Sequence, residues 1–350
     1  MVDNNQTEDN NIEVDDEQNE LYEHHHIVAD KGQKPVRIDK FLVDKIENAS
    51  RNKIQLAANA GNILVNDKAV KSNYKIKPND VVSIVMAYPP RDIEIVPQDI
   101  PINILYEDDD IIMINKEAGM VVHPSFGHYT ETLINALAFH LKDSPLFKDS
   151  KDVRPGLVHR IDKNTSGILV IAKTEIAKQK LAKQFFDHTI ERKYIALVWG
   201  SFDEKEGTIT GNIGRSLKNR KVMSVFPDEE YGKHAVTHYK VIEELGYVSL
   251  IECQLETGRT HQIRAHMKFI GHPVFNDETY GGEQILRGTT FTKYKQFVQN
   301  CFKLLPRHAL HAKSLGFIHP ITNKYVFFDS ELPDDMAQTI DKWRNYISNR

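Results

Sequence analysis

A polar loop that runs directly into an apolar stretch is found in residues 156–173, GLVHRIDKNTSGILVIAK. The composition of residues 167–171 is that of a buried strand. The loop before it carries the polar side chains His159, Arg160, Asp162, Thr165 and Ser166. Because rigid strands often position reactive loops, Asp162 is a candidate catalytic group. The residues alone leave a second interpretation open, in which Asp162 only caps the turn through Thr165 or Ser166.

A second informative stretch is residues 255–267, LETGRTHQIRAHM. Gly258 permits a tight turn after a strand, and the residues that follow have helical character. On such a helix Thr260, Arg264 and Met267 lie near one face, so Arg264 can point inward toward a carboxylate. A buried ion pair with a purely structural role fits the same pattern.

The histidines of the chain invite a metal-site interpretation, which the sequence does not support. His261 and His266 are followed later by His308 and His311, but no cysteine pair and no HExxH arrangement accompanies them. Dinucleotide and Walker-type phosphate loops are missing as well. The two cysteines, Cys253 and Cys301, are expected to be reduced thiols.

The domain organisation follows from changes in composition. Residues 1–30 are polar and acidic, and we expect a disordered tail. Residues 36–85 form a predicted small α+β unit, residues 86–100 a proline-containing linker, and residues 101–350 a larger domain. Short strands dominate that larger domain, at Ile111–Ile114, Gly167–Ile171, Tyr194–Val198, Val248–Leu255 and Lys324–Phe328, with helices at Thr132–Leu141 and Glu175–Asp187. Hairpin-like spacing without strict strand–helix alternation predicts an α+β fold with a long mixed, mainly antiparallel sheet.

The net charge of −4 conceals an uneven distribution. Nine acidic residues and no Lys or Arg lie in residues 1–24, so removing them from the total of 49 leaves 40 acidic against 45 basic residues. Cations crowd the predicted small unit at Arg37, Lys40, Arg51, Lys53, Lys68, Lys71, Lys75 and Lys77. Such a surface is suited to a phosphate backbone, although an ordinary solvated surface has a similar composition.

Together these stretches resemble the RluA/RluD family of pseudouridine synthases. His159–Asp162 with Thr165–Gly167 resembles the motif HRLDxxTSG, and Leu255–His266 resembles LxTGRTHQIRxH. The strand that includes Lys193–Ala196 resembles the strand written KxYxA, with Tyr194 and Ala196 at the motif's Tyr and Ala. Residues 104–124 resemble the opening of the domain. Residues 36–85 resemble the small αL-type RNA-binding domain of some ribosomal proteins. The Gly127-His128 element favours the RluD branch, whose members act on large-subunit ribosomal RNA.

The resemblance implies that the chain is an RNA pseudouridine synthase with a central cleft. It implies that this enzyme needs no cofactor and no metal. It implies Asp162 as the nucleophile, Arg264 as its partner and Tyr194 as the residue that stacks on the target uracil. It implies that Arg160 fills the space left by an extruded nucleotide, because a stacked base is inaccessible. For the small domain it implies RNA-backbone contacts by Arg37, Lys40, Arg51, Lys53, Lys68 and Lys71. The sequence leaves open whether Asp162 attacks the ribose or the base.

Two alternatives to this enzyme remain at the level of sequence. The chain could be an RNA-binding or ribosome-assembly protein of the same fold, which would keep its function when Asp162 is replaced. A nucleoside hydrolase would normally need a second acidic residue, whereas the motifs here offer Arg264. We further expect a cytoplasmic location, because neither a secretory signal nor an apolar membrane span is evident. We expect a monomer, because the sequence shows neither a coiled-coil pattern nor an apolar surface stripe.

Overall fold

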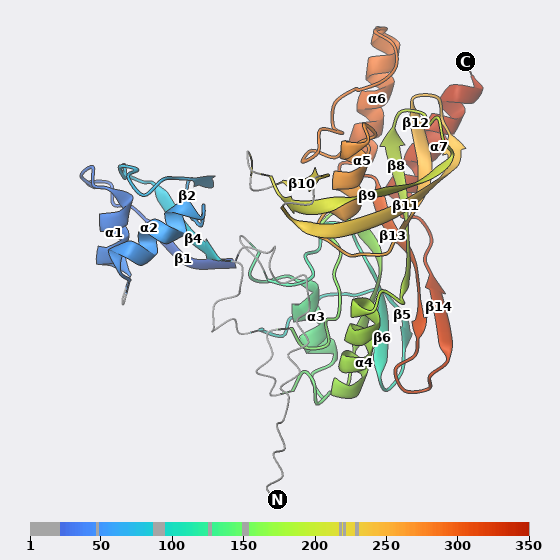
Figure 1. The fold of residues 1–350 in the computed structure, drawn as a ribbon. Coiled ribbons are helices and arrows are strands. Elements are labelled where there is room, and N and C mark those ends of the chain that lie inside the picture. Colours follow the sequence, from blue (N-terminus) through green and yellow to red (C-terminus); the bar gives the residue numbers. More distant parts are fainter. Residues whose placement is uncertain are drawn as a thin grey trace, which may run out of the picture.

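The computed structural model describes residues 22–46, 49–86, 95–124, 128–148, 154–216, 219, 222–227 and 231–349. These residues form two β-sheets, each with a hydrophobic core of its own, and Figure 1 shows them in two separate bodies. The helices of the described residues include none that is long and apolar enough to cross a membrane.

The smaller body is a four-stranded sheet in the order β1-β4-β2-β3, with two helices. Its elements are β1 (Tyr22–Val28), α1 (Ile38–Lys45), α2 (Arg51–Asn59), β2 (Ile63–Val65), β3 (Lys68–Ala69) and β4 (Val81–Met86). The apolar face of α1 places Ile38 and Leu42 in the core, both fully buried. Asn66 and Asp67 connect β2 to β3 with positive φ angles of 48° and 62°, as a two-residue hairpin turn requires.

Strand β1 corrects the expectation that residues 1–30 are disordered. Residues 22–28 pair antiparallel with β4, from Tyr22 opposite Met86 to Val28 opposite Val81. The three successive histidines hid this strand, because edge pairing depends on backbone hydrogen bonds more than on apolar side chains. Residues 1–21 of the expected tail lie outside the described part of the chain.

The larger body contains a ten-stranded sheet in the order β10-β9-β11-β12-β8-β13-β7-β6-β5, with β14 paired to β13. Its strands are β5 (Ile104–Glu107), β6 (Ile111–Lys116), β7 (Ser166–Ala172), β8 (Glu191–Trp199), β9 (Glu206–Arg215), β10 (Met223–Phe226), β11 (Lys233–Glu244), β12 (Val248–Leu255), β13 (Leu310–Ile318) and β14 (Tyr325–Asp329). Among the strands that the structure describes, neighbours pair antiparallel except β13 and β7, which pair in parallel. The predicted α+β fold with a mixed, mainly antiparallel sheet is confirmed.

Within the described ranges of the chain, five helices accompany this sheet, namely α3 (Leu133–His140), α4 (Glu175–Phe186), α5 (Gln262–Phe269), α6 (Thr292–Leu304) and α7 (Asp334–Ser348). Figure 1 shows α3 and α4 near β5 and β6, and α6 and α7 in the upper part of this body, with α7 beside β12. Helix α5 packs against β9, β10 and β11. Its first residue is Gln262, so Thr260, expected on the helix with Arg264, lies before it.

The parallel pair β7–β13 lies in the middle of the sheet and depends on a glycine. Gly167 has a φ of +116°, and a Cβ on it would lie 2.2 Å from the carbonyl oxygen of Ala312 in β13. Only glycine allows the two backbones to approach this closely without strain. The close approach brings the start of β13 against the loop that precedes β7.

Candidate active site

A cleft of about 230 Å³ opens beside the loop that precedes β7. Its walls come from that loop, α4, β8, the turn after β12, and α5. The lining includes Arg160, Ile161, Asp162, Phe185, Arg192, Tyr194, Leu255, Arg259, His261, Arg264 and Leu310. The four residues expected to carry or assist the chemistry, Arg160, Asp162, Tyr194 and Arg264, are thus brought to one cavity from three distant parts of the sequence.

At the floor of the cleft, a carboxylate and a guanidinium are in direct contact. Nη1 of Arg264 donates a hydrogen bond of 2.8 Å to Oδ2 of Asp162. The Asp162 side chain is 20% exposed and the Arg264 side chain 6%, so the carboxylate faces the cleft and the guanidinium lies behind it. Asp162 can therefore meet a substrate, while Arg264 is shielded from water.

The guanidinium is held from its other side by a second carboxylate. Nε and Nη2 of Arg264 donate to Oδ2 and Oδ1 of Asp277 at 2.7 and 2.9 Å. Asp277 is fully buried, and its Oδ1 also accepts from the backbone N–H groups of Thr279 and Tyr280 at 3.1 and 3.2 Å. The Tyr280 ring lies 4.9 Å from the guanidinium carbon. A bidentate pair of this kind fixes the plane of the arginine and so the direction in which Nη1 points.

The surroundings keep Asp162 ionised at neutral pH. Burial by itself raises the pKa of Asp162. The positive charges of His261, which is protonated in the acid range where this carboxyl titrates, and of Arg264 outweigh burial and hold the pKa well below its usual range. Burial lowers the pKa of His261 to about 4, so near pH 7 this imidazole is neutral and Arg264 supplies the positive charge. Nε2 of His261 lies 3.9 Å from the Asp162 carboxylate, and its Nδ1 lies 3.0 Å from the Tyr280 hydroxyl.

The interpretation of Asp162 as a mere turn cap is not what the structure shows. The turn is closed by the backbone, because Thr165 N–H donates to the carbonyl oxygen of Asp162 at 3.1 Å. The Thr165 hydroxyl instead lies 2.8 Å from Nε2 of His308, and the Ser166 hydroxyl lies 2.9 Å from Nδ1 of His311. The Asp162 carboxylate is thus directed to Arg264.

Strand β8 presents Tyr194 and Arg192 to the cleft on the same face, since alternate residues of a strand share a face. Tyr194 is 9% exposed. Lys193 points the other way and pairs with Glu252 at 3.0 Å. Gly258 leaves room for Arg192, because a Cβ there would lie 2.6 Å from its Nη1. Lys193 was the basic residue named from the sequence, but the residue that lines the cleft is Arg192, two positions before Tyr194, as strand alternation requires.

His159 has a structural position beside the cleft. Its Nε2 accepts from the N–H of Val170 in β7 at 3.0 Å, and its ring stacks on Phe185 at 4.5 Å. Burial lowers the pKa of His159 to about 3, which keeps the acceptor nitrogen unprotonated. The side chain therefore attaches the loop to the sheet.

Three residues near Asp162 and Arg264 were not assigned to the active site from the sequence. They are Asp277, His261 and Lys116. Lys116 is 2% exposed, and its ammonium donates to the carbonyl oxygens of Glu117, Met120 and Lys163 at 2.7, 2.9 and 3.0 Å. Burial lowers the pKa of Lys116 to about 7. For Lys116, the only signal in the sequence was an apolar strand that ends in a lysine. Asp277 lies in a polar loop with no distinguishing sequence feature, so no local pattern pointed to it.

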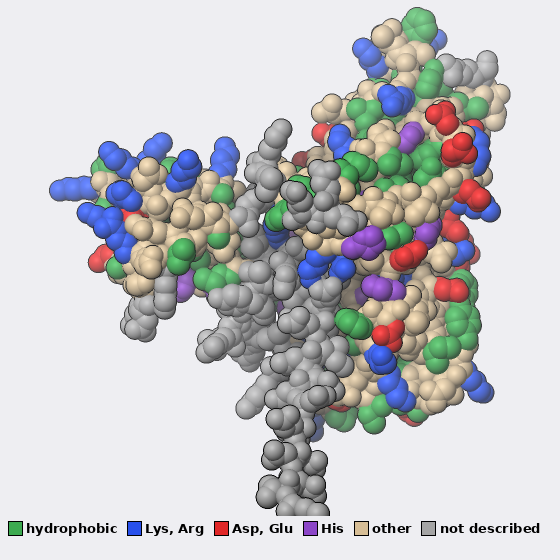
Figure 2. Space-filling view, in the orientation of Figure 1, with side chains coloured by type: hydrophobic (Ala, Val, Ile, Leu, Met, Phe, Trp, Pro, Cys, Tyr) green, Lys and Arg blue, Asp and Glu red, His purple; other side chains and the backbone are tan. Residues whose placement is uncertain are grey.

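On the smaller body, the predicted RNA-binding cations fall into two groups. Arg37 and Arg51 are partly exposed and both donate to the buried Asp39, Arg37 through two nitrogens at 3.1 and 2.9 Å and Arg51 through Nε at 3.1 Å. Lys40, Lys68 and Lys71 are exposed. The side chain of Lys53 lies outside the described atoms. Figure 2 shows Lys and Arg side chains gathered over the outer surface of this body.

Comparison with known proteins defines the class. Residues 110–269 match the family model of RNA pseudouridylate synthases, and residues 36–82 match the S4 domain. An uncharacterized RNA pseudouridine synthase of Chlorobaculum parvum is 49% identical over 91% of this chain and 97% of the relative. YlyB of Bacillus subtilis, with the same description, is 43% identical over 91% and 97%. Ribosomal large subunit pseudouridine synthase D of Zymomonas mobilis is 43% identical over 86% and 91%.

Two solved structures share the fold. Human RNA pseudouridylate synthase domain containing 1 has a TM-score of 0.50 at 23% identity, covering 71% of this chain and 96% of that structure. Human RNA pseudouridylate synthase domain containing 4 has a TM-score of 0.52 at 21% identity, covering 69% and 93%.

This chain belongs to the RNA pseudouridine synthase family, in its RluA/RluD-like branch. It is an enzyme that isomerises uridine to pseudouridine in RNA, and it carries an S4 domain at its N-terminal side. The resemblance drawn from the sequence motifs is confirmed.

Proposed function

We propose that the chain converts specific uridines of large-subunit ribosomal RNA to pseudouridine, with Asp162 as the nucleophile. The observation that carries the proposal is the Asp162 carboxylate, which faces the cleft and accepts a 2.8 Å hydrogen bond from the buried Arg264. The ribosomal substrate is supported by the relatives named ribosomal large subunit pseudouridine synthase D, at 37–43% identity.

The isomerisation breaks the bond between the ribose and the uracil nitrogen, turns the base and forms a bond to carbon. Asp162 supplies the carboxylate that attacks the nucleotide or stabilises positive character on the sugar. Arg264 keeps that carboxylate ionised and oriented. The Tyr194 ring supplies an apolar face for the uracil, and its hydroxyl is a candidate to accept the proton that leaves carbon.

Entry of the target requires that its nucleotide leave the RNA stack. Arg160 lies two residues before Asp162 and lines the same cleft. Its planar guanidinium can stack on neighbouring bases and contact phosphate. We therefore propose that the Arg160 side chain fills the space that the extruded nucleotide leaves in the RNA stack.

The smaller body is proposed to bind RNA backbone. Residues 36–85, together with strand β1, are proposed as one domain, the residues up to 100 as a linker and residues 101–350 as the catalytic domain. Supporting cations are Arg37, Lys40, Arg51, Lys53, Lys68 and Lys71. Asp39 orients Arg37 and Arg51, so these two can present donors in a fixed geometry. Such contacts position the RNA and carry little sequence information.

The test maps pseudouridines in ribosomal RNA from cells with the gene, without it, and with the gene carrying Asp162→Asn. We expect specific sites in large-subunit RNA to lose pseudouridine without the gene and to regain it only with the unmodified gene. Recovery with Asp162→Asn would reject the nucleophile. Unchanged ribosomal RNA, together with loss of pseudouridine in another RNA, would reject the ribosomal substrate. Monomeric state and cytoplasmic location stay predictions.

A further inference from the structure

A second buried arginine, Arg307, has the same kind of anchor as Arg264. Its Nε and Nη2 donate to Oδ2 and Oδ1 of Asp335 at 2.7 and 2.9 Å. The Arg307 side chain is 6% exposed. Asp335 belongs to the first turn of α7, so the C-terminal helix fixes the plane of this guanidinium.

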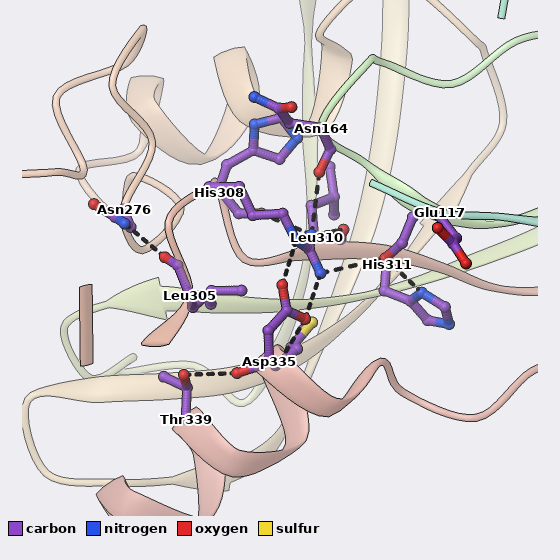
Figure 3. Close-up of polar contacts among 12 residues, drawn as sticks. Glu117, Asn164, Asn276, Leu305, His308, Leu310, His311, Asp335 and Thr339 are labelled. Carbon is purple, nitrogen blue, oxygen red and sulfur yellow. Dashed lines mark hydrogen bonds and ion pairs between the residues drawn. The ribbon is translucent and has the colours of Figure 1, made fainter. Parts of the chain in front are cut away.

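The third nitrogen of Arg307 reaches the loop that carries Asp162. Nη1 donates to the carbonyl oxygen of Asn164 at 3.1 Å, and to those of His308 and Leu310 at 3.2 and 3.3 Å. In Figure 3, Asn164 and Asp335 approach this network of contacts from opposite sides. One side chain therefore joins α7, the start of β13 and the backbone two residues beyond Asp162.

The neighbouring loop residues are held by two distant segments, the end of β6 and the stretch that leads into β13. Lys116 binds the carbonyl of Lys163, His308 contacts the Thr165 hydroxyl, and His311 contacts the Ser166 hydroxyl. Of the side chains that hold the loop in these contacts, only Arg307 is itself held by a carboxylate, that of Asp335, which lies outside both the loop and the sheet. Its anchor is independent of the substrate-facing wall of the cleft.

The position of the loop backbone controls where the Asp162 carboxylate lies. A catalytic group displaced by about 1 Å commonly loses about a hundredfold in rate. Arg264 restrains the side-chain end of Asp162, whereas Arg307 restrains the main chain just after it. With both restraints, the carboxylate is fixed from two directions, and neither arginine side chain need move when RNA binds.

We propose that Arg307, oriented by Asp335, is a positioning residue for the isomerisation. It fixes the backbone of residues 162–166 so that the Asp162 carboxylate stays against Nη1 of Arg264. The proposal rests on the proposed role of Asp162 as the nucleophile. Helix α7 would therefore influence catalysis through Asp335, although α7 contributes no residue to the lining of the cleft described above.

The experiment uses the full chain and single-turnover conversion of uridine in an RNA substrate at saturating enzyme. Arg307→Met should lower the rate constant by about 10- to 100-fold while the Kd for RNA stays within about twofold. Arg307→Lys keeps the positive charge, but an ammonium cannot bind Asp335 in bidentate fashion and also reach Asn164, so its rate should stay well below wild type.

Arg344→Met is the matched control, because Arg344 also anchors α7, through Glu243 at 2.7 Å, on the exposed side of the helix. Its rate should stay within about twofold of wild type, as expected for loss of an exposed ion pair. An equal loss in Arg344→Met would mean that anchoring of α7 in general matters, and would overturn the proposal. So would an Arg307→Met rate within about twofold of wild type, or a loss confined to the Kd.

Asp335→Asn decides the question if Arg307→Met does not fold. It keeps the guanidinium and removes only the charge of its anchor, so we expect a smaller loss, about three- to tenfold, at unchanged Kd. If both single variants fold, the double variant should be no slower than Arg307→Met, because the two residues act as one unit. A wild-type rate for Asp335→Asn would overturn the role of the anchor. Full activity of Asp162→Asn would instead reject the proposed function.

Discussion

The buried Asp277 allows a sharp test of how the cleft is built. Asp277→Asn preserves shape but removes the charge that faces Nε and Nη2 of Arg264 at 2.7 and 2.9 Å. Removing one partner of a buried ion pair costs about 3–5 kcal/mol. Since Asp162 still neutralises part of the Arg264 charge and asparagine keeps one acceptor oxygen, we expect the lower end, about 3 kcal/mol of unfolding free energy.

The same change should slow the isomerisation. Without its bidentate anchor, the guanidinium of Arg264 can rotate, so the direction of the hydrogen bond from Nη1 to Asp162 is no longer fixed. We expect a single-turnover rate about 10- to 100-fold below wild type. The unfolding free energy is measured by urea denaturation, and the rate by conversion of uridine in RNA under conditions where the variant is folded.

Asp341→Asn is the matched control. Asp341 pairs with Arg344 at 2.9 Å, but its side chain is 62% exposed, so the pair is screened by solvent. We expect its unfolding free energy to fall by no more than about 0.5 kcal/mol and its rate to be unchanged. If Asp277→Asn costs no more than Asp341→Asn, burial does not set the strength of the Arg264 pair and the reasoning is refuted.

Three further results are expected. Asp162→Asn should abolish pseudouridine formation while the Kd for RNA, measured by a binding titration, changes by no more than about twofold, because the lost group is the nucleophile. Burial lowers the pKa of His308 to about 3 and of His311 to about 4. The unfolded chain therefore binds more protons below about pH 6.5, and urea titrations should show stability falling with pH toward 4, by up to about 1.4 kcal/mol per pH unit per imidazole. Lys68→Glu with Lys71→Glu should flatten the dependence of log affinity on log salt by about one unit per lost phosphate contact, measured by RNA titrations.

Each of these results has an outcome that would contradict it. Pseudouridine formed by Asp162→Asn would remove the assigned nucleophile. A flat stability profile between pH 6.5 and pH 4 would mean that His308 and His311 are not kept neutral in the folded protein. An unchanged salt slope for the lysine variant, equal to that of the exposed control Lys324→Glu, would exclude an RNA-binding role for this face of the smaller body.

The sequence by itself determined the class of the molecule and the main parts of its cleft. A polar loop before an apolar strand made Asp162 a candidate, and the turn and helix around Arg264 made it another, because both features depend on residues close together in the chain. The resemblance of these motifs to a known family then implied that the two residues act together. The α+β architecture followed in the same way from short strands with hairpin spacing.

Tertiary structure decided which charges meet. Nothing in the local sequence links Arg264 to Asp277, or Arg307 to both Asp335 and Asn164, because these contacts join segments that only the assembled sheet brings together. Strand β1 was missed for the same reason, since its pairing with β4 depends on backbone groups that every sequence possesses. Periodicity and local motifs record which face of an element is buried, whereas the partner of a buried charge is fixed only by packing in three dimensions.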